Sequence, residues 1–182
     1  MEDVSINKSI HLSEHLASPS EAALSHSSEL NGLRLSPHFT LGELCKTTYH
    51  PYDGNIPSHV AIENLRNISE NWLEDLRHTY NTLYSDESLD IPVVITSGYR
   101  SEEVNRLCGG AKGSNHLTGC AVDIRCAGPE QLIRYSSILL DIADGTHRDF
   151  DELIHEKRGT TWWIHFAVRP SGNRRKILFD MR

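Results

Sequence analysis

The sequence places an imidazole and a carboxylate seven residues apart, at His116 and Asp123. Both groups are good zinc ligands, with bond lengths of roughly 2.0–2.2 Å. Gly119 and Ala121 lie between them, and such small residues leave room for a metal and a substrate close to the backbone. The pair therefore indicates a candidate metal site. A loop histidine beside a capping aspartate, without a metal, is the alternative interpretation.

His165 is the third candidate ligand. It lies in the apolar segment Trp162–Val168, where an isolated histidine is more often a buried, hydrogen-bonded core residue. With His116 and Asp123, however, it completes a set of two histidines and one aspartate. Catalytic zinc sites have three protein ligands and keep a fourth position for water. Together the three residues point to a catalytic zinc centre.

Hydrophobic periodicity predicts the elements that must position these residues. Apolar residues at steps of three and four indicate a helix from an N-cap at Ser58 to about Tyr84. Pro129 marks the start of a second long helix. Apolar, β-branched or alternating runs predict strands at 91–96, 120–125, 152–156, 162–168 and 177–179, and short helices follow Thr40 and Ser101. We therefore expect an α+β fold, in which helices pack on a small antiparallel sheet that carries the zinc site.

Length and composition limit the domain organisation and the class of protein. The 182 residues suit one ordinary domain. Residues 1–35 are rich in serine and contain no aromatic residue, so we expect a flexible tail followed by a folded domain over residues 36–182. The formal net charge of −7 argues against a protein that binds nucleic acid mainly through phosphates. The sequence contains no run of about 18 apolar residues, as a membrane span would need.

The N-terminus and the cysteines bear on the compartment. Met1, Glu2 and Asp3 make the start acidic where a signal peptide would be basic, so we expect a cytoplasmic protein as the chain is written. The four cysteines form no C-x-x-C pair, which favours free thiols over a disulfide scaffold, although a bridge from Cys120 to Cys108 or Cys126 stays open. We expect a monomer.

Three motifs, taken together, resemble a known family. They are Ser-x-His-x-x-Gly-x-Ala-x-Asp at 114–123, Ser-Gly-Tyr-Arg at 97–100 and Trp-x-His at 163–165. In this order they look like the zinc D-alanyl-D-alanine carboxypeptidase family. That family includes peptidoglycan DD- and LD-peptidases, D-Ala-D-Ala dipeptidases and phage endolysins, and its fold recurs in hedgehog signalling domains. The resemblance spans about Phe39 to Val168, and Phe-Thr-Leu-x-Glu-Leu at 39–44 is similar to one branch.

The resemblance implies a role for each matching residue. His116, Asp123 and His165 would bind zinc. Arg100 would stabilise the oxyanion of the tetrahedral intermediate, and Ser114 would help to hold the substrate. Trp163, from the last motif, is a further substrate-binding candidate. Five basic residues lie near the C-terminus: Arg169, Arg174, Arg175, Lys176 and Arg182. They either attract anionic cell-wall polymer or form a solvated edge of the domain.

One position departs from the family pattern. Many members carry a catalytic Glu or Asp three residues before the last histidine, and Trp162 stands there instead. The branch with the similar opening tends to have a glutamate on the penultimate strand. The replacement must come from another segment, and the acidic stretch 151–156 is the obvious source.

A hairpin register predicts which carboxylate takes this role. If residues 157–161 form a tight turn, Glu156 lies opposite Trp163, and Ile154 lies opposite His165. Because side chains alternate along a strand, Glu156 then shares a face with His165 and lies diagonal to it. We therefore predict Glu156 as the general base, unless it is a solvated glutamate beside the turn. Glu152 shares the face at a greater predicted separation and is the fallback.

These features predict a zinc metallopeptidase, either a carboxypeptidase or an endopeptidase. Its expected substrates are peptidoglycan stem peptides, cut at D-Ala-D-Ala or at a nearby L,D bond by metal-activated water. The protein would reach the cell wall if it were released or delivered by a phage. The alternative function is a peptidoglycan-binding module that contains zinc but is catalytically inactive, because the usual acid is absent.

Overall fold

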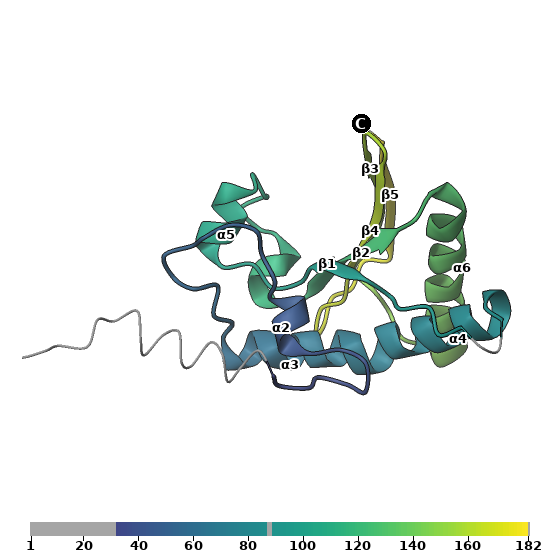
Figure 1. Cartoon of the computed structure of the whole chain (residues 1–182). Helices are drawn as coiled ribbons and strands as arrows, with labels where there is room; N and C mark the ends of the chain where they lie inside the picture. The colour runs from purple at the N-terminus through teal and green to yellow at the C-terminus, as the bar shows by residue number, and fades with distance from the viewer. Residues whose placement is uncertain (1–31, 87–88, 182) are drawn as a thin grey trace, which may run out of the picture.

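The computed structural model describes residues 32–86 and 89–181, and this part of the chain forms an α+β fold around one sheet (Figure 1). The five strands lie in the order β1-β2-β4-β3-β5. Neighbouring strands are antiparallel except for β3 and β5, which are parallel. The predicted fold class is confirmed, with one parallel pair at the edge. The strand bounds are Ile95–Ser97 for β1, Ala121–Cys126 for β2, Glu152–Arg158 for β3, Thr161–Ala167 for β4 and Lys176–Met181 for β5.

The predicted helix after Ser58 is confirmed, with a change of winding in its middle. It consists of α3 (His59–Ile68), a π-helical segment (Ser69–Leu73) and α4 (Glu74–Tyr84), which run as one long segment (Figure 1). The Ser58 side chain caps it by accepting from the Ala61 amide. The wider π turn lets Trp72 and Leu73, adjacent in sequence, both be buried, at 1% and 0% exposure.

The other predicted helices also begin at their predicted caps. Thr40 caps α2 (Leu41–Leu44), and Ser101 caps α5 (Glu102–Leu107). Pro129 occupies the first turn of α6 (Pro129–Thr146). A short 3-10 helix, η2 (Asn115–Thr118), precedes β2.

The core lies between the sheet and the helices. Val122 and Ile124 of β2 and Ile164 and Phe166 of β4 are fully buried in it. Trp72 packs on Phe166, with ring centroids 5.0 Å apart. Because side chains alternate, the residues between these core positions face the other side of the sheet, where the candidate site lies.

The predicted strand at 91–96 is wrong over its first four residues, since β1 covers only Ile95–Ser97. Pro92 has no amide hydrogen to donate to a neighbouring strand. The backbone of Ile91 is bonded instead to the Asn81 side chain of α4, which accepts from its amide at 2.7 Å and donates to its carbonyl at 2.9 Å. The start of this segment is therefore hydrogen-bonded to helix α4 and not to a neighbouring strand.

The predicted tail and its boundary are only partly within the described residues. Residues 1–31 lie outside them, so the division at residue 35 stays a prediction. Leu35 is buried at 1% exposure, and Arg34 forms an isolated bridge with Thr40. All four cysteines are free thiols. Among the described helices, none has the length and apolar character to cross a membrane.

Candidate metal centre

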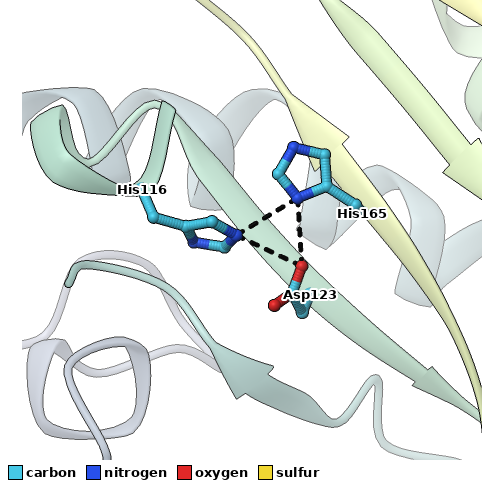
Figure 2. A group of neighbouring side chains, drawn as sticks. All are labelled: His116, Asp123 and His165. Carbon is cyan, nitrogen blue, oxygen red and sulfur yellow. Dashed lines mark hydrogen bonds and ion pairs between the residues drawn. The ribbon is translucent and has the colours of Figure 1, made fainter. Parts of the chain in front are cut away.

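His116, Asp123 and His165 come together on the face of the sheet opposite the core (Figure 2). His116 comes from η2, whereas Asp123 and His165 lie directly opposite each other on β2 and β4. His116 Nε2 is 3.2 Å from Asp123 Oδ1 and 3.1 Å from His165 Nδ1, and His165 Nδ1 is 3.1 Å from Asp123 Oδ1. All three side chains are largely buried, and they bring one ligand atom each to a common point.

The three atoms fit a small divalent metal ion. Tetrahedral ligands at zinc distances are separated from one another by about 3.3–3.6 Å, slightly more than the edges of this triangle. Two imidazole nitrogens and one carboxylate oxygen also form a typical donor set. His116 is oriented for binding, because its Nδ1–H donates to the carbonyl of Gly98 at 2.6 Å and Nε2 keeps its lone pair toward the centre.

Two glycines make this arrangement of His116 possible. A side chain at Gly98 would place its Cβ 2.2 Å from the carbonyl oxygen of Leu44. Gly119 ends η2 with a φ of +70°, in the left-handed region, and a Cβ there would lie 2.3 Å from the carbonyl oxygen of Ala61. The glycine of each motif thus allows a close backbone contact beside the ligand.

Ser114 and Arg100, both predicted from the resemblance, lie beside the centre. The Ser114 hydroxyl accepts from the His116 amide at 3.3 Å and so caps η2. Arg100 Nη2 bonds to Asp123 Oδ2, and its Nε donates to Ser97 Oγ at 2.8 Å. Arg100 therefore holds the second oxygen of the ligand carboxylate and leaves Oδ1 to the centre.

The pKa values of the ligands favour positive charge on His165 and negative charge on Asp123, but a neutral His116. Burial lowers the pKa of His116. Burial also disfavours a charged His165, but Asp123 and Glu152 outweigh it and raise the pKa of His165 to about 9. Burial would raise the pKa of Asp123, yet the two histidines hold it well below its usual range. A cation placed at the centre would meet the same stabilisation.

The centre opens into a polar cavity of about 580 Å³. One wall is the β3–β4 hairpin, whose predicted register is confirmed: Glu156 pairs with Trp163, and Ile154 pairs with His165. Glu156 and Trp163 line the cavity, as do Arg100 and Ser114. The structure thus brings every predicted site residue to one cavity.

The predicted greater distance of Glu152 from His165 is wrong. Glu152 pairs with Ala167, so Glu152 and Glu156 both lie two positions from Ile154 and both are diagonal to His165. Glu152 Oε2 is 3.7 Å from His165 Nε2, the nitrogen that faces away from the other two ligands. Glu152 is therefore the carboxylate that contacts the ligand.

The surroundings of the two glutamates differ. Glu152 accepts hydrogen bonds from Arg174 at 2.9 Å and Asn115 at 3.3 Å, and its pKa is lowered, chiefly by its contact with His165. Burial raises the pKa of Glu156, and the charge of Asp123 raises it further. The charge of His165 and, to a smaller extent, a hydrogen bond from the Trp163 side chain partly offset this rise.

An ion-pair cluster that the sequence does not predict lies at the Glu152 end of the cavity. Asp151, with 0% exposure, accepts from Arg174 at 2.7 and 2.6 Å and from Asn115 at 2.9 Å. Arg169 Nε is 3.1 Å from the same carboxylate. The sequence shows the acidic stretch 151–156 and the basic residues Arg169 and Arg174, but nothing in it pairs them with each other or with Asn115. Asp151 itself does not line the cavity.

Comparisons with known proteins agree with the site. A family model described as Peptidase M15 matches residues 37–155. The matched region includes η2 and β2, with the ligands His116 and Asp123, and ends before His165. A search of curated proteins finds no match.

Proposed function

The chain belongs to the Peptidase M15 family, as the resemblance of its motifs predicted, and from this premise we propose that it is a zinc-dependent peptidase of peptidoglycan stem peptides. The family supports a peptidase that acts on peptidoglycan in general. The finer proposal is hydrolysis of D-Ala-D-Ala or of a nearby L,D bond. The observation that carries the proposal of a zinc peptidase is the convergence of His116, Asp123 and His165 at a polar cavity large enough for a peptide.

His116 Nε2, Asp123 Oδ1 and His165 Nδ1 would hold the zinc ion. When bound there, zinc supplies Lewis acidity, which polarises a carbonyl group and makes water easier to deprotonate. Glu152 would keep the His165 ring in place by accepting from its outer nitrogen, as carboxylates commonly do for metal-bound histidines. Arg100 would keep the Asp123 carboxylate in place by donating to its second oxygen.

Glu156 is the proposed general base. It lines the cavity diagonal to His165, at a position that reaches a substrate held beside the ligand. Its raised pKa suits an exchange of protons near neutral pH. Glu156 would take the proton of the attacking water and pass it to the leaving amine. Glu152 is less suited, because its carboxylate already contacts Arg174, Asn115 and His165.

The remaining cavity residues would bind the substrate and its transition state. Arg100 Nη1 has no partner among the described residues, so it is left to donate to a developing oxyanion. The Ser114 hydroxyl and the half-buried Trp163 would hold the peptide against the hairpin.

One observation favours a second candidate function. Trp162, in the position where the family often has its acid, cannot accept a proton. If Glu156 does not replace that acid, the protein would bind stem peptides and zinc without cleaving them.

Metal content and cleavage of muropeptides, measured on the same preparations, test the proposal. The wild type should carry one zinc per chain and release products, and a chelator should stop cleavage until zinc is restored. His165→Ala should lose zinc and lower cleavage by about 10³-fold or more, since both metal and water activation are removed. His78→Ala, on the exposed face of α4, is the control and should change neither.

Each adverse outcome has a separate meaning. A wild type that takes up no zinc from zinc-containing buffer would contradict the metal site. Bound zinc without cleavage of any stem peptide would favour the binding module over the peptidase.

A further inference from the structure

Arg169 and Arg174 line the Glu152 end of the cavity, and the buried carboxylate of Asp151 contacts both of them. Arg174 Nε and Nη2 donate to Asp151 at 2.7 and 2.6 Å. Arg169 Nε donates to Asn115 Oδ1 at 3.1 Å and lies equally far from Asp151 Oδ2. Because Asp151 is wholly buried, these contacts fix the two guanidinium groups from their inner sides.

The outer sides of the same groups are left free. Within residues 32–86 and 89–181, neither Nη1 nor Nη2 of Arg169 has a partner, and Nη1 of Arg174 has none. The side chains of Arg169 and Arg174 are 37% and 45% exposed. An arginine anchored through Nε presents a preorganised pair of donors, the geometry that matches a carboxylate.

The local charge also favours an anion. Three cations, Arg169, Arg174 and Lys176, meet two carboxylates, Asp151 and Glu152. One positive charge therefore remains uncompensated, before any metal ion is considered. An additional carboxylate in the cavity would complete the balance.

We infer that Arg169 and Arg174 form a carboxylate-binding subsite that selects stem peptides carrying a free carboxylate close to the cleaved bond. This inference rests on the proposed peptidase function and specifies which peptides its cavity accepts. Arg169, with two free donor groups, is the principal contact, and Arg174 adds one donor.

The position of the subsite sets its distance from the reacting bond. Glu152 and Ile154, which is opposite His165, are two strand positions apart, or about 6–7 Å. One residue of an extended peptide spans about 3.3–3.6 Å. A side chain at the Glu152 end therefore holds a carboxylate within about two residues of the peptide bond at the metal centre.

Two carboxylates of a stem peptide meet this requirement. One is the C-terminal carboxylate of the leaving residue, which would make the protein a carboxypeptidase. The other is an internal carboxylate of the stem, which would make it an endopeptidase. Arg169 would bind either carboxylate in the same way, so only a comparison of substrates can distinguish the carboxypeptidase from the endopeptidase.

Three synthetic stem peptides test the subsite. The first is a pentapeptide ending in D-Ala-D-Ala with all carboxylates free, the second is its C-terminal amide, and the third has its internal carboxylates amidated. Binding is measured by calorimetry on metal-free protein with chelator present, and cleavage is measured separately on the zinc-loaded protein. Wild type, Arg169→Gln and Arg158→Gln are compared. Arg158 is a matched control, because it is exposed and lines the opposite end of the cavity.

In the wild type, amidation of one of the two carboxylate sources should weaken binding by about 10- to 100-fold, the range for a lost charge-assisted hydrogen bond. Loss with the terminal amide identifies the carboxypeptidase, and loss with the internal amide identifies the endopeptidase. Arg169→Gln should weaken binding of the free acid by much of this factor and should discriminate less between acid and amide than the wild type, because only the donor of Arg174 remains. Arg158→Gln should keep the discrimination of the wild type.

Equal binding of all three peptides by the wild type would overturn the inference, as would discrimination in Arg169→Gln equal to that of the wild type. If Arg169→Gln fails to fold, Arg169→Lys keeps the charge beside Asp151 but lacks the two-pronged donor. Its discrimination should fall, and discrimination equal to that of the wild type would overturn the inference. Selective binding without cleavage by the zinc-loaded wild type would contradict only the proposed peptidase.

Discussion

Glu152 and Glu156 are the same residue type at equivalent positions on β3, yet their surroundings give them opposite properties. Each lies two positions from Ile154, on the same face of the hairpin and on the same cavity. Glu152 contacts His165, Arg174 and Lys176, and its pKa is lowered. At Glu156, burial raises the pKa.

The difference comes from His165, whose interaction with Glu152 lowers the pKa of that carboxyl most, and from the segment after β4. Arg169 and Arg174, with Lys176 at the start of β5, supply cations to the Glu152 end of the hairpin. The Glu156 end lies beside the turn, and its cavity neighbour is Trp163. One end is built to hold charges in place, whereas the other leaves a carboxylate able to exchange a proton. Equal register therefore does not imply an equal role.

The substitution Glu156→Gln should have the largest effect on this comparison. It keeps the size of the side chain but cannot take a proton, so turnover of muropeptides should fall on the order of 10²-fold or more, the range for a positioned general base. Zinc content should be unchanged, because Glu156 contacts no ligand atom. Both are measured on one preparation. Full turnover in this variant would remove Glu156 from the mechanism.

The substitution Glu152→Gln should lower the affinity for zinc and leave the proton-transfer step unchanged. Loss of the carboxylate beside His165 Nε2 should weaken zinc affinity by about 10- to 100-fold. Turnover at saturating zinc should stay close to that of the wild type. Competition with a zinc chelator measures the affinity. A variant that binds zinc normally but is inactive would exchange the roles of the two glutamates.

The substitution Asp151→Asn should loosen the Glu152 end of the hairpin, although Asp151 itself does not line the cavity. Hydrogen bonds from Arg174 outweigh the effect of burial and lower the pKa of Asp151 from its ordinary value of 3.8. A lowered pKa means that the ionised carboxylate stabilises the fold above 3.8 and that this contribution disappears as the pH falls through the folded-state pKa. The variant should lose about 1.5–3 kcal/mol of unfolding free energy at pH 7.

Denaturant unfolding of both proteins at several pH values measures this loss. The difference between wild type and variant should shrink on acidification. Asp141→Asn is the control, as an exposed carboxylate of α6, and should cost little at any pH. A loss that is independent of pH would mean that packing, not charge, makes Asp151 important.

Local patterns could be predicted from the sequence, whereas the ion-pair cluster could not. The pairing of Glu156 with Trp163 follows from a short turn and a period of two. Ser58 and Ser101 could be identified as caps because a hydroxyl satisfies a nearby amide. The cluster at Asp151 joins residues from η2, β3 and the segment after β4. Pairs between such distant segments leave no periodic signal, so the basic residues after β4 could not be assigned to the cavity.

Trp163→Phe should have the smallest effect, and it tests the Glu156 end alone. The change keeps an aromatic face for the substrate but removes the indole N–H, and with it a hydrogen bond that lowers the pKa of Glu156. The pKa of Glu156 should therefore rise further. A base is active when deprotonated, so the acidic limb of the kcat/KM profile should move to higher pH, while kcat at its optimum changes by less than about tenfold. Trp162→Phe is the matched control, because Trp162 contacts Lys157 and does not line the cavity. A limb that stays in place with Trp163→Phe would show that this hydrogen bond does not set the pKa of the base, and a limb that moves equally with Trp162→Phe would show that packing of the hairpin, not the bond, moves it.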